Sequence, residues 1–201
     1  VAMNRLLQGD VGSGKTAVAA AIMYNAVKNH FQAALMAPTE VLATQHFKTL
    51  QKFFGEDINI ELLTGSVTAK NKRIIRERLA DGTCDIVVGT HAIIQNDVEF
   101  KRLGLVITDE QHRFGVNQRN TLSQKGNNPH TLVMSATPIP RTLAMMIYGD
   151  LDISVLDELP KGRQPIKTFC VPTSYHKRIY NFLHKNIKEG RQCYVVCPLV
   201  D

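Results

Sequence analysis

The most specific chemistry in this 201-residue sequence is found in a glycine-rich segment near its start. The segment matches the pattern G-x-x-x-x-G-K-[ST], in which glycines let successive backbone N–H groups turn toward phosphate oxygens. A helix starting at the loop adds partial positive charge, Lys15 adds a charge for the β- and γ-phosphates, and Thr16 offers a hydroxyl to Mg²⁺. We therefore expect ATP and Mg²⁺ as cofactors. The expected nucleotide contacts are Gly9, Asp10, Val11, Gly12, Ser13, Gly14, Lys15 and Thr16.

A second chemical segment begins with two carboxylates directly after an apolar run at residues 103–108. Asp109 is expected to bind Mg²⁺ together with Thr16, and Glu110 to orient and deprotonate the attacking water. An apolar strand ending in Asp-Glu is common, but its occurrence with the phosphate loop favours a hydrolytic site. His112 is either an exposed loop histidine or a sensor of the γ-phosphate, and the sequence leaves both open. The candidate catalytic residues are Lys15, Asp109, Glu110, Gln111 and His112.

Short apolar runs alternate with helical patterns along the chain, which predicts a parallel sheet covered by helices on both faces. The expected strands are residues 5–8, 33–37, 59–63, 85–88, 105–108, 131–134 and 153–156. The expected helices are residues 15–29, 39–54, 69–80 and 139–148. Such doubly wound α/β folds bind ligands at the carboxyl ends of their strands, and the polar segments of this sequence follow the strands at those ends.

A stretch rich in proline, glycine and charge at residues 158–165 predicts a linker. We expect a first domain over residues 1–157 and the beginning of a second over residues 166–201, with a strand at 166–171, a helix at 175–188 and a strand at 193–197. Both ends of the sequence look cut, so we interpret the chain as a fragment of a longer protein.

The composition is that of a globular protein, with 44% hydrophobic and 21% charged residues. A net charge of +6 weakly favours a polyanionic partner. The four cysteines show no C-x-x-C pair, which argues against a zinc site. No apolar run approaches the roughly 20 residues of a membrane span, and no signal peptide is visible. We expect a cytoplasmic protein without a membrane partner.

Several segments together resemble the superfamily 2 helicases, and among them the RecG family of bacterial ATP-dependent DNA helicases. The resemblance extends over essentially the whole chain. Its most specific segments are residues 6–16, 37–46, 109–116 and 135–142, which read LLQGDVGSGKT, APTEVLATQH, DEQHRFGV and SATPIPRT.

The resemblance implies a RecA-like lobe with a P-loop and the start of a second RecA-like lobe, in a monomeric motor that walks along DNA. In such a motor ATP hydrolysis drives the unwinding and remodelling of branched DNA in recombination and repair. Coupling of the ATP site to the moving lobe is assigned by resemblance to Ser135, Ala136 and Thr137.

The resemblance also implies contacts with the DNA backbone at the ends of three strands. Hydroxyl and backbone N–H groups there are suited to phosphate oxygens, which a motor must bind without reading sequence. Helix capping is an alternative role, above all for Thr39 and Ser66. A basic helix at residues 70–78 is either a solvated face or a further DNA contact. The expected DNA contacts are Pro38, Thr39, Thr64, Gly65, Ser66, Thr90 and His91.

Three other functions compete with this interpretation. A transcription-repair coupling translocase shares the motifs, but it typically has Glu at Gln111 and Phe at Ser13. A non-catalytic nucleotide-binding scaffold would not need Glu110. A P-loop enzyme acting on small molecules would have no use for the polar segments at the other strand ends. We also expect the isolated chain to be weakly active or inactive, because the second lobe of this family completes the ATP site.

Overall fold

The computed structural model describes residues 2–109, 121–136, 151–158 and 166–197. Internal contacts divide the chain into two compact units, Val1–Lys161 and Gly162–Asp201. The division falls inside the expected linker at residues 158–165. The expected helix at residues 139–148 lies outside the described residues.

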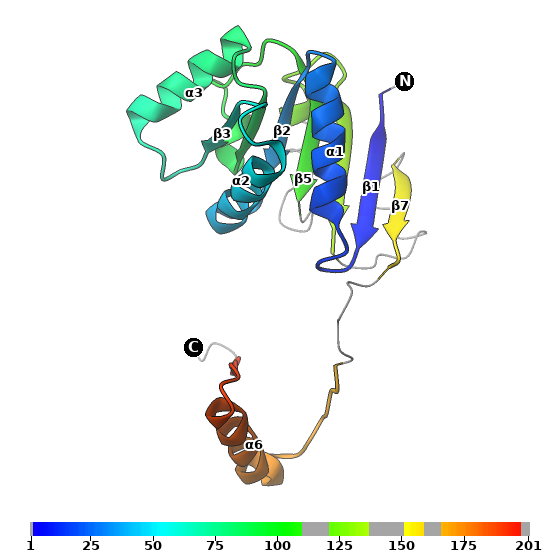
Figure 1. The fold of residues 1–201 in the computed structure, drawn as a ribbon, viewed down its shortest axis with the longest axis vertical. Coiled ribbons are helices and arrows are strands. Elements are labelled where there is room, and N and C mark those ends of the chain that lie inside the picture. The colour runs from blue at the N-terminus through cyan, green and yellow to red at the C-terminus, as the bar shows by residue number, and fades with distance from the viewer. Residues whose placement is uncertain (1, 110–120, 137–150, 159–165, 198–201) are drawn as a thin grey trace. The chain divides into compact units, whose positions relative to one another are not determined.

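The first unit is built on a seven-stranded sheet in the order β3-β4-β2-β5-β6-β1-β7 (Figure 1). Every neighbouring pair runs parallel. All seven strands expected in this unit form, with ends that lie within two residues of the expected ones. Their bounds are β1 Asn4–Gly9, β2 Gln32–Met36, β3 Ile60–Leu63, β4 Ile86–Gly89, β5 Leu103–Asp109, β6 His130–Ser135 and β7 Asp152–Leu156.

Among the described residues, the α-helices that connect these strands are α1 Lys15–Lys28, α2 Glu40–Phe54 and α3 Ala69–Asp81. The start of α2 is set by Thr39, whose hydroxyl accepts a hydrogen bond from the backbone N–H of Leu42 at 3.3 Å. The start of α3 is set in the same way by Thr68 and not by Ser66. The short 3-10 helix η1, His91–Ile94, was not expected from the sequence.

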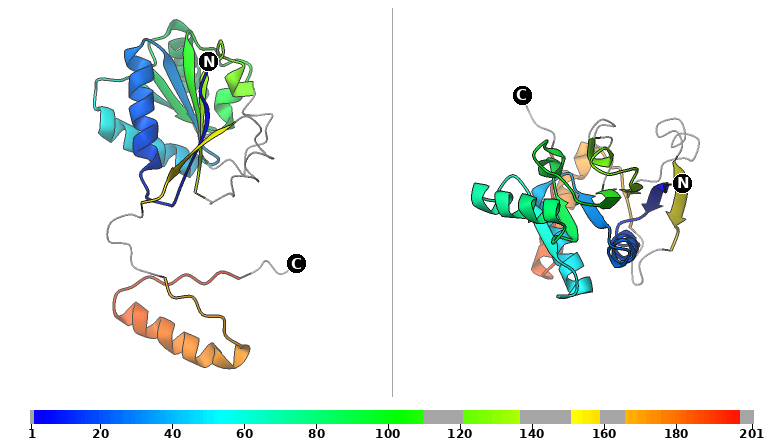
Figure 2. Two further views of the ribbon diagram at one scale, coloured as in Figure 1. Left: turned by 90° about the vertical axis from the view of Figure 1, so that its right-hand side faces the viewer. Right: turned by 90° about the horizontal axis from the view of Figure 1, so that it is seen from above.

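The core lies in two layers, one on each face of the sheet. Alternate residues of β2 point to opposite faces, so Ala33 and Leu35 pack in the layer containing α1 and α2. Ala34 and Met36 pack in the layer containing α3 and η1. Figure 2 shows α1 lying along one side of the sheet. The expected arrangement of helices on both faces is therefore confirmed.

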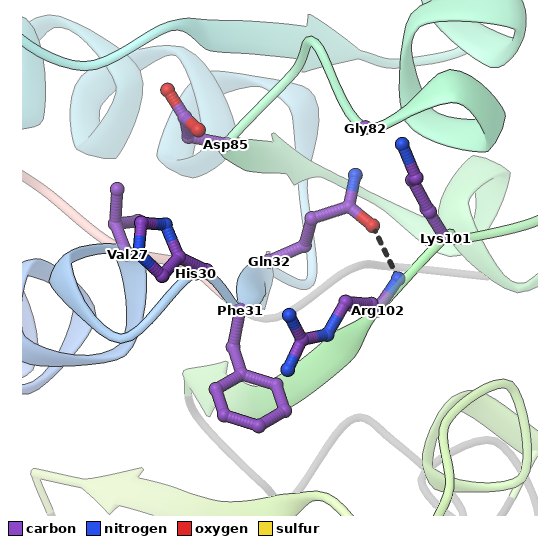
Figure 3. A pocket seen from close by; sticks show the side chains of 8 residues that line it. All are labelled: Val27, His30, Phe31, Gln32, Gly82, Asp85, Lys101 and Arg102. Atoms are coloured by element: carbon purple, nitrogen blue, oxygen red, sulfur yellow. Dashed lines mark hydrogen bonds between the residues drawn. The ribbon is translucent and has the colours of Figure 1, made fainter.

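A buried glutamine joins three elements at the amino ends of the strands (Figure 3). Gln32 is 5% exposed, and its side-chain amide donates to the backbone oxygens of Leu79 and Cys84 at 2.9 and 2.8 Å. Its side-chain oxygen accepts from the backbone N–H of Arg102 at 2.9 Å. One side chain thus forms hydrogen bonds with backbone groups at the end of α3, before β4 and before β5. These bonds offset the free-energy cost of burying the polar amide.

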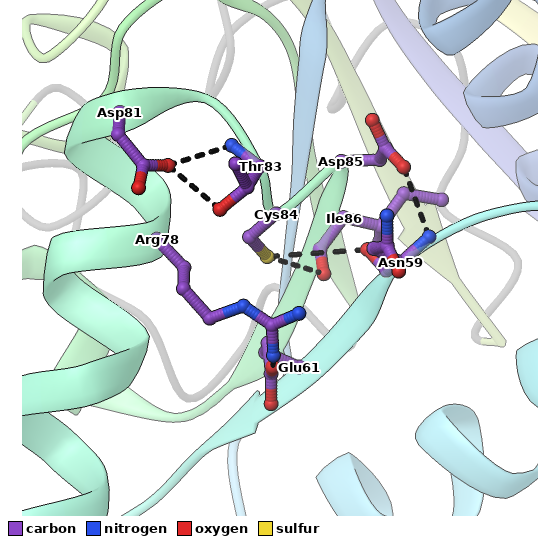
Figure 4. A network of polar contacts seen from close by, with 8 residues as sticks. All are labelled: Asn59, Glu61, Arg78, Asp81, Thr83, Cys84, Asp85 and Ile86. Atoms are coloured by element: carbon purple, nitrogen blue, oxygen red, sulfur yellow. Dashed lines mark hydrogen bonds and ion pairs between the residues drawn. The ribbon is translucent and has the colours of Figure 1, made fainter.

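A polar network lies between α3 and the start of β4 (Figure 4). Arg78 forms an ion pair with Glu61, and Asp81 accepts from the backbone N–H of Thr83 at 2.8 Å. The Cys84 thiol is enclosed beneath this network, and burial raises its pKa to about 12. The thiol therefore stays protonated, as expected of a cysteine with a packing role.

The second unit contains a short 3-10 helix, η3 Thr173–Tyr175, and the helix α6 His176–Lys188. The prediction of strands at residues 166–171 and 193–197 was wrong, because both segments are described without regular structure. A strand needs a hydrogen-bonded neighbour, and the described residues of this unit supply none. Apolar side chains there are exposed, including Phe169, Phe182 and Val196.

The Gln32 junction leads to a prediction for stability. Gln32→Leu keeps similar volume but removes three hydrogen bonds, so we expect the free energy of unfolding to fall by about 2–4 kcal/mol. Urea denaturation of the chain measures this change. Gln51→Leu on the exposed side of α2 is the matched control and should stay within about 0.5 kcal/mol of the wild type. Equal effects of both substitutions would contradict the proposed junction.

Candidate nucleotide and nucleic-acid site

The expected site segments all begin at one edge of the sheet. Because the strands are parallel and in register, their carboxyl ends align there. The loop that begins at Gly9 follows β1, Asp109 ends β5, and Ser135 ends β6 between them. The segments expected to contact DNA follow β2, β3 and β4, which are neighbours in the other half of the sheet. The edge thus has two halves, which we call the nucleotide half and the DNA half after the contacts expected from the sequence.

The phosphate loop has a conformation that depends on its glycines. Gly12 and Gly14 have φ angles of 81° and 96°, which are favourable for glycine and strained for other residues. The ammonium of Lys15 donates to the backbone oxygens of Gly9 and Asp10, both at 2.8 Å. Lys15 therefore lies inside the curve of the loop, where a phosphate-binding loop needs its positive charge.

The phosphate loop is closely packed at Gly9 and Ser13. A Cβ on Gly9 would lie 2.5 Å from the Ser13 hydroxyl and 3.0 Å from Cβ of Leu156, so only glycine fits there. The Ser13 hydroxyl is itself buried and has no hydrogen-bond partner among the described residues. The loop is therefore packed against the end of β7 and leaves no space for a larger residue at position 9.

Asp109 has a neighbour that the sequence analysis did not single out. His46 of α2 places Nε2 2.6 Å from Oδ2 of Asp109. Both side chains are largely enclosed, with exposed fractions of 10% for His46 and 13% for Asp109. The available signal was a polar residue on the buried stripe of α2, between Ala43 and Leu50.

Several expected site residues lie outside the described part of the chain. These are Glu110, Gln111, His112 and Thr137, whose catalytic and coupling roles remain predictions. Of the coupling residues that are described, Ser135 is 2% exposed and Ala136 is half-buried. Ser135 pairs in register with Gln8 of β1, which brings it to the base of the phosphate loop.

The oxygen groups expected to bind Mg²⁺ suit that ion. Magnesium prefers oxygen ligands and binds proteins through one or two carboxylates or hydroxyls together with phosphate oxygens. Thr16 lies in the first turn of α1, and Asp109 ends β5 at the same edge of the sheet. The His46 contact holds one carboxylate oxygen of Asp109, which fits a ligand of fixed orientation.

In the DNA half, Glu40 organises the loop at residues 64–66. Its carboxylate accepts from the backbone N–H of Ser66 at 3.1 Å, and Lys72 donates to the backbone oxygen of Gly65 at 2.9 Å. The hydrogen bond from the Ser66 hydroxyl, with backbone N–H groups of Ser66 and Gly65 and the charge of Lys72, holds the pKa of Glu40 below its ordinary value. Thr64 is buried, with its hydroxyl 3.0 Å from that of Ser66.

The other expected DNA contacts differ in accessibility. Pro38 and Thr39 are half-buried, and Thr39 is committed to capping α2. His91 is exposed, whereas Thr90 is 3% exposed and its buried hydroxyl has no partner among the described residues. Direct contact of DNA with the hydroxyls of Thr64 and Thr90 therefore requires a local rearrangement.

Several basic side chains of helix α3 form ion pairs with carboxylates of the protein itself. Arg76 forms an ion pair with Asp97 at 2.6 Å, Arg78 with Glu61, and Arg73 with Glu77 at 3.5 Å. These pairs favour the solvated, structural interpretation of α3 over a dedicated DNA surface. No helix in the described ranges is long and apolar enough to span a membrane.

Comparison with known proteins identifies a family that this chain matches. A family model described as DEAD/DEAH box helicase matches residues 2–146. The ATP-dependent DNA helicase RecG of Bacillus subtilis (strain 168) is 56% identical over 200 residues, covering 99% of this chain and 29% of the relative. RecG of Staphylococcus aureus (strain NCTC 8325 / PS 47) is 52% identical over 201 residues, covering 100% of this chain and 29% of the relative. The expected likeness to RecG-type helicases is confirmed.

Solved structures agree with this likeness. A structure of RecG bound to a three-way DNA junction has a TM-score of 0.85 and 47% identity, covering 99% of this chain and 27% of that one. The helicase domain of Hef from Pyrococcus furiosus has a TM-score of 0.61 at 19% identity, covering 78% of this chain and 35% of that one, and shows the shared fold. The RecA-like fold is confirmed. The chain spans less than a third of the length of these RecG relatives.

The crowding at Gly9 leads to a prediction for nucleotide binding. Gly9→Ala must displace the loop, and we expect ATP affinity of the full-length protein to fall about 10-fold to 100-fold. Ser13→Ala keeps the backbone N–H expected to contact phosphate and removes only a hydroxyl that has no partner among the described residues, so it should change affinity by less than about twofold. Titration with a fluorescent ATP analogue compares the two variants. Wild-type affinity in Gly9→Ala would refute the close packing of the loop.

Proposed function

The chain belongs to the DEAD/DEAH box helicase family, and on this basis we propose that it is the ATP-binding part of a RecG-type DNA helicase. In the whole protein this part couples ATP hydrolysis to the unwinding and remodelling of branched DNA, as at replication forks and Holliday junctions in recombination and repair. The observation that carries the proposal is the meeting of the Lys15 loop and Asp109 at one edge of the sheet, in a chain 56% identical to a RecG helicase.

In the nucleotide half, each described residue has a separate task. The ammonium of Lys15 exchanges its two backbone oxygens for the β- and γ-phosphates, and the N-terminus of α1 adds partial positive charge. Thr16 and Asp109 would hold Mg²⁺, which would offset negative charge on the phosphates. Glu110, following Asp109 in the sequence, orients and deprotonates the attacking water.

In the DNA half, the exposed polar groups contact the phosphates of the DNA backbone and not the edges of the bases. Ser66 and His91 are exposed, and the N-terminal caps of α2 and η1 lie at the same edge of the sheet. Such contacts bind any sequence, which a translocating motor requires, and they weaken steeply with salt. We propose that branched DNA is the substrate, in keeping with the junction complex of the RecG relative.

The remaining assignments follow from the same proposal. Residues 1–157 form the first RecA-like lobe, residues 158–165 a linker, and residues 166–201 the beginning of the second lobe. The protein acts as a monomeric motor with ATP and Mg²⁺ in the bacterial cytoplasm. Ser135, Ala136 and Thr137 couple the ATP site to movement of the second lobe.

Removing the positive charge of the loop tests the proposal. Lys15→Ala in the full-length protein should lower DNA-stimulated ATP hydrolysis at least about 100-fold, because the charge that develops on the phosphates in the transition state loses the ammonium of the loop. Phosphate release with forked DNA measures the rate. The control is Lys28→Ala, an exposed lysine in the last turn of the same helix. Undiminished turnover in Lys15→Ala would sink the proposal.

The chain by itself should be a poor enzyme. Groups from the rest of the protein supply part of the electrostatic stabilisation, so we expect little DNA-stimulated hydrolysis from these 201 residues. The measurement compares equal concentrations of the chain and the full-length protein, with and without forked DNA. Turnover by the chain equal to that of the full-length protein would contradict this prediction, because these 201 residues would then suffice for ATP hydrolysis.

A further inference from the structure

The contact between His46 and Asp109 joins the two halves of the sheet edge. His46 lies in α2, the helix that begins at the Thr39 cap in the DNA half. Asp109 ends β5, the strand next to β2, in the nucleotide half. The 2.6 Å contact therefore spans the boundary between the segment expected to touch DNA and the carboxylate expected to bind Mg²⁺.

The chemistry of the two side chains determines which of them donates the hydrogen bond. A carboxylate oxygen accepts hydrogen bonds, so in this pair Nε2 of His46 is the donor and Oδ2 of Asp109 is the acceptor. The exposed fractions of 10% and 13% leave little water to replace this bond. A charge so enclosed needs a hydrogen-bonding partner, and the ring supplies one with a fixed orientation.

The position of His46 on its helix argues against a purely packing role. Ala43, His46 and Leu50 form the buried stripe of α2. An apolar residue would fill the same place without desolvating an imidazole, so a histidine there has a cost that its bond to Asp109 offsets. Groups that orient a metal ligand in this way raise metal affinity or activity by about 10-fold to 100-fold.

We propose that His46 is a positioning residue for Asp109 and links the DNA-side helix α2 to the Mg²⁺-binding carboxylate. The inference rests on the proposed ATP-dependent DNA helicase function. A shift of α2 when DNA engages its N-terminus moves the ring and with it the carboxylate. DNA then adjusts the ATP site through one hydrogen bond, with no contact of its own to nucleotide.

The test measures the affinity of the full-length protein for Mg²⁺ in the presence of a non-hydrolysable ATP analogue, and then the Mg²⁺ dependence of ATP hydrolysis at saturating ATP. His46→Ala should raise the Mg²⁺ concentration for half-maximal rate about 10-fold. It should also lower the ratio of DNA-stimulated to basal turnover. His46→Gln places an amide N–H near the position of Nε2 and should restore both values to within about threefold of the wild type. Thr49→Ala, on the same helix with its hydroxyl bonded only to the backbone oxygen of Gln45, is the matched control.

The outcomes separate the inference from the function it rests on. Unchanged Mg²⁺ dependence in His46→Ala overturns the positioning role, and an unchanged stimulation ratio overturns the link to DNA. A loss that His46→Gln does not restore points to packing alone and also overturns the proposal. If His46→Ala fails to fold, His46→Leu fills the volume without a donor and takes its place. A wild-type protein without DNA-stimulated hydrolysis would instead refute the proposed function.

Discussion

The site depends on the parallel pairing of β1, β6 and β5. These strands end together, so the phosphate loop, Ser135 and Asp109 converge at one edge although more than 90 residues separate the loop from Asp109. A register shift of one residue would turn each side chain to the opposite face of the sheet. Both faces of these strands are buried, so such a shift would move each side chain into the opposite core layer, where the surrounding side chains have other sizes and shapes.

The phosphate loop illustrates how the core and the chemistry constrain each other. Its glycines permit a backbone that curls around Lys15, and the crowding at Gly9 presses the loop against β7. The lysine is satisfied by backbone oxygens of its own loop, so its charge is held in place by the fold. A site prepared in this way loses little entropy when a triphosphate arrives.

Helix α2 connects the two halves of the edge. Helix α2 begins beside the DNA half and reaches Asp109 through His46. Glu40, at the first position of the same helix, holds the loop at Ser66. One rigid helix therefore touches both the expected DNA loop and the expected metal ligand, and it can carry a displacement between them.

Local sequence patterns were enough to predict the strands and α-helices described in the first unit and its phosphate loop. Continuous apolar runs specify buried parallel strands, and G-x-x-x-x-G-K-T specifies a loop from its own backbone requirements. The strands expected at residues 166–171 and 193–197 did not form, since pairing depends on neighbours that a local pattern does not contain. Only the tertiary structure brought His46 to Asp109, buried the hydroxyl of Thr90 and paired Arg76 with Asp97. Those contacts join residues distant in sequence, and their formation is decided by which helix packs on which strand.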